Sequence, residues 1–177
     1  MSTKQMLFSG FGGQGILFAG KFIAYKGLME EKQVSWLPSY GPEMRGGTAS
    51  CSVIVSDEPV GSPIVSKPDV LVAMNLPSLD KFEATVAPGG MIFADSTLIE
   101  RKVERTDVQV FYIPATQLAS ENEMPTLANM IIVGKILKEL GEYDEEKISN
   151  ALKKVISAKR ADMLEINLKA MRIGAEN

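Results

Sequence analysis

The sequence contains no histidine and a single cysteine, Cys51, among its 177 residues. Histidine is the commonest general base near neutral pH and the commonest metal ligand, so neither role can rest on an imidazole here. An iron–sulfur cluster takes four ligands, mostly thiolates, and an internal disulfide takes two cysteines. If this protein takes part in redox chemistry, the redox centres must therefore lie on another chain.

The sequence also lacks an excess of basic charge and any long hydrophobic run. Lys and Arg number 19 and Asp and Glu number 22, which gives a net charge of −3 and no footprint for nucleic acid. No apolar stretch approaches the roughly 20 residues that a membrane span needs, and no signal peptide is visible at the N-terminus. We therefore expect a cytoplasmic protein with neither a nucleic-acid nor a membrane partner.

Apolar segments of strand length alternate with amphipathic segments of helix length, which predicts an α/β fold with a Rossmann-like, mostly parallel sheet flanked by helices. We expect a single domain over residues 1–177, because this length suits one well-buried core. The predicted strands are Lys4–Ser9, Gln33–Leu37, Thr48–Val55, Asp69–Met74, Met91–Asp95 and Val108–Ile113. The predicted helices are Gly13–Leu28, Leu76–Val86, Thr126–Leu140, Asp144–Ser157 and Asp162–Arg172. The strand at Thr48–Val55 follows its predecessor too closely for a helical crossover, so we expect it to be antiparallel or at an edge.

The first motif is GFGGQG at Gly10–Gly15, placed between the first strand and the first helix. It satisfies the G-x-G-x-x-G pattern, in which glycines let an anion approach the free N–H groups of a helix N-terminus. The alternative is a tight turn that needs glycine only for packing. A standard NAD site also requires an acidic residue at the end of the second strand, where this chain has Leu37, Pro38 and Ser39. That ending disfavours a nicotinamide cofactor.

The second motif is SYGPEMRGGTA at Ser39–Ala49, which follows the second strand and should emerge at the same edge of the sheet as GFGGQG. Arg45, next to Gly46 and Gly47, could bind a phosphate or carboxylate through two hydrogen bonds. The alternative is a rigid surface loop whose charged side chains make ordinary contacts.

Four other polar positions carry weaker signals. Cys51 lies in an alternating apolar and polar run, which favours a buried structural thiol over a reactive one. Asn75 and Asp95 each end a predicted strand. Each side chain could either face a crevice at that edge of the sheet or cap the following loop. Asn129 lies in an almost wholly apolar helix, so we expect a satisfied core group or a helix–helix contact there.

Further motifs accompany these two, namely DVLVAMN at Asp69–Asn75, TLANMIIVGKIL at Thr126–Leu137, and N-x-x-A at Asn167 and Ala170. Together they resemble the gamma subunit (gamma domain) of the 2-oxoacid:ferredoxin oxidoreductases over nearly the whole chain. The paired motifs also occur in the related beta subunit of indolepyruvate ferredoxin oxidoreductase. The resemblance therefore fixes the family more firmly than the substrate.

The resemblance implies an assembly that decarboxylates a 2-oxoacid, more specifically 2-oxoglutarate, with coenzyme A (CoA) and ferredoxin as the electron acceptor. It implies thiamine diphosphate and [4Fe–4S] clusters on the alpha, beta and ferredoxin-like delta subunits, and no catalytic residue or metal on this chain. Its expected share is contact with CoA and assembly of the complex. The residues that we expect to take part are Gly10, Gly12, Gly13, Gln14, Gly15, Arg45, Gly46 and Gly47.

Other functions remain open from the sequence. The chain could be a purely structural subunit whose glycine turn contacts a partner protein, or the indolepyruvate-type beta subunit. An independent nicotinamide enzyme would bind NAD(P)H as a lone chain, and the ending of the second strand argues against it.

Overall fold

The computed structural model describes residues 2–39 and 48–177. The strands of this part are β1 (Thr3–Phe11), β2 (Gln33–Ser39), β3 (Thr48–Ser56), β4 (Val70–Ala73), β5 (Met91–Asp95) and β6 (Gln109–Ile113). The α-helices are α1 (Ile16–Met29), α2 (Leu76–Phe82), α3 (Ala115–Glu121), α4 (Ala128–Glu139), α5 (Glu145–Val155) and α6 (Met163–Glu176). Two single turns of 3₁₀ helix are η1 (Glu83–Thr85) and η2 (Ala158–Arg160).

The strands form one sheet in the order β2-β3-β1-β4-β5-β6. Strands β1, β4, β5 and β6 are parallel, whereas β3 runs antiparallel to both β1 and β2. The predicted mostly parallel α/β sheet is confirmed, and so is the antiparallel direction of β3. Because β3 lies between β1 and β2, the edge strand on this side of the sheet is β2.

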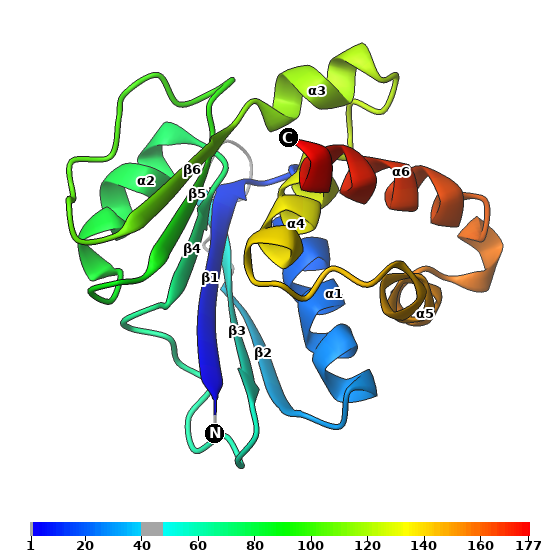
Figure 1. Cartoon of the computed structure of the whole chain (residues 1–177), viewed down its shortest axis with the longest axis horizontal. Helices are drawn as coiled ribbons and strands as arrows, with labels where there is room; N and C mark the ends of the chain where they lie inside the picture. Colours follow the sequence, from blue (N-terminus) through cyan, green and yellow to red (C-terminus); the bar gives the residue numbers. More distant parts are fainter. Residues whose placement is uncertain (1, 40–47) are drawn as a thin grey trace.

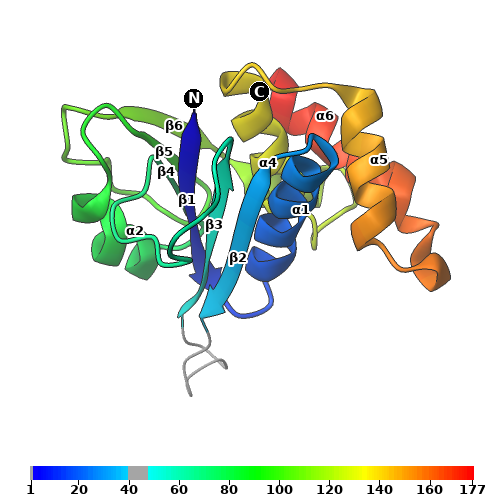
Figure 2. The same ribbon diagram turned by 90° about the horizontal axis from the view of Figure 1, so that it is seen from below.

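The helices divide unequally between the two faces of the sheet. Helices α1, α4, α5 and α6 cover one face and α2 covers the other (Figures 1 and 2). Strand β4 packs Val70 and Val72 into the core on the first face, and Leu71 and Ala73 into the core on the second. A strand covered on both faces needs apolar residues at every position, which explains its unbroken hydrophobic run.

Helix α4 lies between the sheet and α6, as its nearly all-apolar surface predicts. Two glycines let the backbones of α4 and α6 touch. A Cβ atom on Gly134 would lie 2.0 Å from the carbonyl oxygen of Met171, and one on Gly174 would lie 1.7 Å from that of Ile131. Neither position has room for a larger residue unless the helices move apart.

Several predicted boundaries are wrong for physical reasons. The first helix, predicted from Gly13, begins at Ile16, because Gly13 and Gly15 have positive φ angles of 93° and 73°. Strand β2 continues through Pro38, which an edge strand tolerates. The sequence reading also missed α3, whose seven residues are too few to show a clear helical period.

No helix among the described residues is both long enough and apolar enough to cross a membrane.

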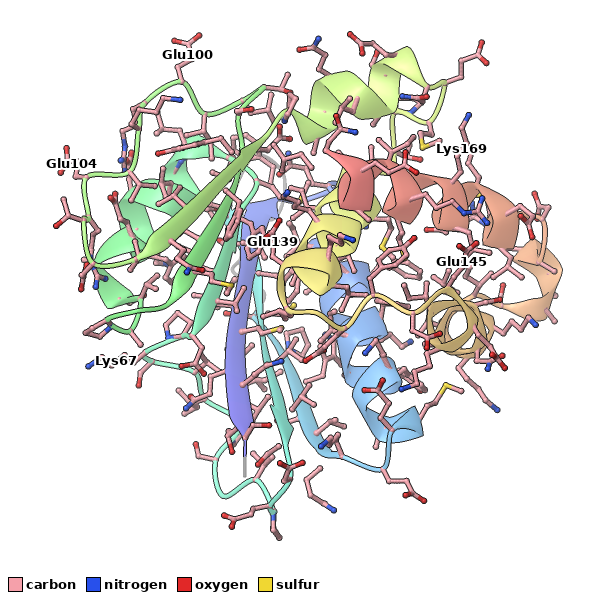
Figure 3. All side chains as sticks on the ribbon, viewed as in Figure 1. Lys67, Glu100, Glu104, Glu139, Glu145 and Lys169 are labelled. Atoms are coloured by element: carbon pink, nitrogen blue, oxygen red, sulfur yellow. The ribbon has the colours of Figure 1, made fainter. Side chains whose placement is uncertain are left out.

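Charged side chains extend from the periphery of the molecule. Lys67, Glu100 and Glu104 point outward from loops around α2, and Lys169 points outward from α6 (Figure 3).

A buried carboxylate ties η1 to the connection between β5 and β6. Glu83 is 8% exposed and accepts hydrogen bonds from Arg101 Nη2 at 2.8 Å and from the N–H of Glu104 at 2.5 Å. Burial alone would raise the pKa of Glu83, but these hydrogen bonds to its charged form outweigh burial and lower that pKa. The carboxylate therefore stabilises the fold above its ordinary titration range and loses this effect as the pH falls.

We expect Glu83→Gln to lower the free energy of unfolding by about 2 kcal/mol at pH 7, because the bond from Arg101 loses its charged acceptor. The difference from the wild type should shrink as the pH falls through the lowered pKa of Glu83, because the wild-type carboxylate is then protonated as well. Urea unfolding at pH 7 and pH 3 measures both values. Glu100→Gln, at an exposed position, is the control, and an equal loss for Glu83→Gln at both pH values would contradict the assignment.

Candidate functional site

The glycine motif forms the turn between the carboxyl end of β1 and the start of α1, as predicted. Gly10 and Phe11 are the last residues of β1, and Gly15 is the N-cap of α1 in the left-handed conformation. A Cβ atom on Gly10 would lie 2.5 Å from Gln14 Oε1, and one on Gly15 would lie 2.4 Å from Asn129 Nδ2. Gly13 instead has open space around its Cα, so only its φ of 93° demands glycine. The turn is therefore closely packed at its ends and open at Gly13.

Gln14 fixes the turn to the neighbouring strand. Its Oε1 accepts from the N–H of Phe11 at 2.6 Å, and its Nε2 donates to the carbonyl oxygen of Met74 at 3.1 Å. Met74 follows directly on β4, so one side chain links the ends of two parallel strands. The side chain of Gln14 thus positions the turn, and any contact of Gln14 with a ligand stays a prediction.

The N-terminus of α1 has no side-chain cap and no acidic residue in its first turn. Its first N–H groups point out of the helix at the positive end of the helix dipole, which favours an anion. The first intrahelical hydrogen bond from this end runs from the N–H of Ala19 to the carbonyl oxygen of Gly15 at 3.0 Å. The geometry therefore offers backbone donors to an anionic group at the open side of the turn.

Asn129, on α4, also contacts the glycine turn. Its Nδ2 donates to the carbonyl oxygen of Gly15 at 3.0 Å, which joins α4 to the beginning of α1. The expected helix–helix contact is present, but the group is only half satisfied. Its Oδ1 is buried and has no hydrogen-bond partner among the described residues.

Asn75 follows β4 and Asp95 ends β5 at the same edge of the sheet, and each accepts a hydrogen bond from a nearby backbone N–H. Asn75 Oδ1 accepts from the N–H of Ser78 at 2.8 Å and starts α2. Asp95 accepts from the N–H of Thr97 at 3.1 Å and from Thr116 Oγ1 at 2.5 Å. Both side chains therefore accept a capping hydrogen bond, while Asp95 also reaches α3 and the buried Nδ2 of Asn75 has no partner among the described residues.

The second motif cannot be placed in the same way. Arg45, Gly46 and Gly47 lie outside the described residues. Thr48, which follows them, pairs with Phe11 at the end of β1. The motif therefore rejoins the described chain at the sheet edge that carries the glycine turn, while any contact of its arginine with a ligand stays a prediction.

Cys51 is fully buried in β3, as expected for a structural thiol. Burial raises the pKa of the Cys51 thiol to about 12. We expect the native thiol to react with an aromatic disulfide reagent at pH 8 about 1000-fold more slowly than in denaturant, because so little thiolate forms. Reaction of the native chain at the rate of the unfolded chain would contradict its burial.

Comparison with known proteins decides the family. Residues 5–177 match the family described as pyruvate ferredoxin/flavodoxin oxidoreductase. The chain belongs to this family. The resemblance drawn from the paired motifs is therefore confirmed.

Relatives within the pyruvate ferredoxin/flavodoxin oxidoreductase family carry different substrate names. The ketoisovalerate oxidoreductase subunit VorA of Methanothermobacter thermautotrophicus is 42% identical over 170 residues, which cover 95% of this chain and 35% of that protein. The 2-oxoglutarate synthase subunit KorC of Methanocaldococcus jannaschii is 36% identical over 152 residues, which cover 84% and 81%. The chain thus spans about a third of the length of VorA and most of that of KorC.

Solved structures of the family share the fold. The gamma subunit of a keto/oxoacid ferredoxin oxidoreductase from Geobacter sulfurreducens is 29% identical with a TM-score of 0.85, covering 99% of this chain and 96% of that one. The 2-oxoglutarate:ferredoxin oxidoreductase of Magnetococcus marinus, with 2-oxoglutarate, CoA and succinyl-CoA bound, is 25% identical with a TM-score of 0.87. That match covers 99% of this chain and 31% of the longer one.

Proposed function

We propose that this chain is the gamma subunit of a 2-oxoacid:ferredoxin oxidoreductase, and that its glycine turn takes part in binding CoA. Membership of the family and the likeness to a solved gamma subunit support the first part. The observation that carries the second is the uncapped N-terminus of α1 behind the open glycine turn. CoA presents several phosphate oxygens, which such a helix end binds through backbone N–H groups.

In this proposal the complete assembly converts a 2-oxoacid and CoA into an acyl-CoA and CO₂ and passes the electrons to ferredoxin. Thiamine diphosphate and [4Fe–4S] clusters belong to the alpha, beta and delta subunits. This chain supplies a single buried thiol and no imidazole, a donor set that does not suit a cluster. The chain on its own is then inactive.

We favour 2-oxoglutarate as the substrate, and Arg45 with Gly46 and Gly47 as a second set of contacts to the CoA phosphates. Relatives named for 2-oxoglutarate and for ketoisovalerate both occur, so turnover must be measured with both acids. If 3-methyl-2-oxobutanoate (ketoisovalerate) is turned over faster than 2-oxoglutarate, then ketoisovalerate is the substrate instead. Arg45→Ala should raise the apparent KM for CoA and leave that for the oxoacid unchanged.

The second candidate function is a purely structural subunit whose glycine turn contacts a partner protein. The close packing of Gln14 and Asn129 around the turn suits this role as well. Both candidate functions require the chain in the assembly, which is tested by reconstituting the complex from co-expressed partners with and without it. CoA-dependent ferredoxin reduction should require the chain, and full turnover without it would refute the proposal.

A further inference from the structure

Four basic side chains gather where α5 passes into α6. Lys153 and Lys154 lie in the last turn of α5, and residues 159 and 160 lie on η2. Residues 153–160 thus hold four positive charges and no acidic residue, in a chain whose net charge is −3. All four side chains are exposed, and none joins an ion pair formed by the described residues.

The dipole of α5 accounts for only two of these cations. Lys153 and Lys154 lie near the negative end of that helix, where positive charge is stabilising. Lys159 and Arg160 belong to a turn of three residues, which has no dipole of comparable size. Asp162 is the next acidic residue along the chain, and it pairs with neither of them. Within the part of the chain that the structure describes, these two charges have no partner.

The same segment forms one wall of an apolar groove of about 500 Å³. The groove lies beside the glycine turn, between the beginnings of α1, α4 and α6, the end of α5, and η2. Val155 and Ile156, which follow the two lysines, line it together with Phe18, Met163 and Arg160. The four apolar side chains are each partly exposed. Their burial by a bound partner would be favourable.

An apolar centre surrounded by a polar rim is the usual anatomy of a protein–protein interface. Here the rim is positive, so the complementary surface carries acidic residues around an apolar side chain. A nucleic acid or an anionic membrane suits the site less well. The net charge of −3 opposes long-range attraction of a polyanion, and a concave apolar surface does not reach into a bilayer.

We propose that this groove and its basic rim form the docking surface for an acidic patch on another subunit of the assembly, with an apolar side chain of that subunit seated in the groove. The partner's place in the assembly rests on the proposed function. Helices α5 and α6 form the outer layer on the helical face of the sheet, which leaves the surface open to a second chain (Figures 1 and 2). Gly15 also lines the groove, so the docked subunit lies next to the glycine turn.

Biolayer interferometry of this chain with the co-expressed alpha, beta and delta subunits tests the basic rim. Lys159→Glu combined with Arg160→Glu should lower the association rate at least about 10-fold and reduce its dependence on salt, with little change in the dissociation rate. Lys67→Glu combined with Lys102→Glu changes the charge equally at exposed positions outside the groove, and Lys67 lies on the opposite side of the molecule from α5 (Figure 3). Equal association rates for the two double variants would overturn the proposal.

Met163→Glu tests the apolar centre in the same assay. Met163 is the first residue of α6, so a glutamate there meets the positive end of the helix and should leave the melting temperature unchanged. It places a carboxylate in the groove, so the dissociation rate should rise at least about 10-fold. Ile64→Glu, at a loop position that is 67% exposed and outside the groove, is the matched control. A dissociation rate equal to that of this control would contradict the docking site.

The outcomes separate this inference from the proposed function. If the wild-type chain joins the alpha, beta and delta subunits and every variant joins them equally well, the docking surface is wrong and the proposed function is unaffected. If the wild-type chain does not associate with them, both fail. Binding of the isolated chain to single-stranded RNA or to phosphatidylserine vesicles, lost in the variant of Lys159 and Arg160, would assign these cations to a polyanion and also overturn the proposal.

Discussion

Gly174→Ala is expected to destabilise the chain by about 3 kcal/mol, although alanine is the better helix former. The added Cβ would lie 1.7 Å from the carbonyl oxygen of Ile131 in the facing helix. Backbone atoms of α4 cannot rotate away as a side chain can, so α6 must shift as a whole. Its buried residues Leu168 and Met171 would then pack less closely against α4.

Thermal or urea unfolding of the isolated chain measures this loss. Gly61→Ala is the matched control, because a Cβ there would meet nothing within 4 Å and the residue has no positive φ. That control should be neutral or slightly stabilising. An increase in stability for Gly174→Ala, which helix propensity alone predicts, would show that α4 and α6 do not touch as described.

Gly15→Ala is expected to cost about 2–3 kcal/mol of stability and to abolish most CoA-dependent turnover of the assembled complex. Two effects add at this position. The left-handed conformation at φ 73° strains any residue with a Cβ, and that Cβ would lie 2.4 Å from Asn129 Nδ2. Relief of the clash requires the turn to move, which shifts the N-terminus of α1.

A double-mutant cycle separates these two effects. Asn129→Ala removes the obstructing side chain and should recover the part of the loss that comes from the clash. Gly89→Ala carries the same kind of strain at φ 79° in open space, before β5, and reports the cost of strain alone. If Gly15→Ala costs no more than Gly89→Ala, the contact between Asn129 and Gly15 does not hold the turn.

The fold follows from the sequence where local patterns decide it. The short apolar run of β4 and the amphipathic period of α5 can each be recognised within their own segment of the sequence. Local patterns do not determine the order of the strands, because the position of β3 between β1 and β2 depends on pairings across the sheet. Only the short connection before β3 indicated that it could not run parallel to β2.

The candidate site divides in the same way. The glycine turn is readable because its residues are consecutive and lie between a strand and a helix. The bond from Asn129 to Gly15 joins residues 114 positions apart, and no local pattern encodes it. Asn167 stands out in the sequence only as part of a family motif, and no motif of the sequence includes Arg160. Both line one groove with Asn129, and their meeting there depends on how α5 and α6 pack against α4.

The central claim is that the glycine turn binds CoA in the assembled complex, and the apparent KM for CoA of Gly13→Ala tests it most directly. A Cβ on Gly13 meets no atom of this chain within 4 Å, so it can obstruct only what binds outside the turn. Gly89→Ala, which also adds a Cβ at a positive φ, 79°, in open space, is the reference. We predict a KM for CoA at least about 10-fold above that reference, with an unchanged KM for the oxoacid. An unchanged KM for CoA in a complex that assembles normally would contradict the account.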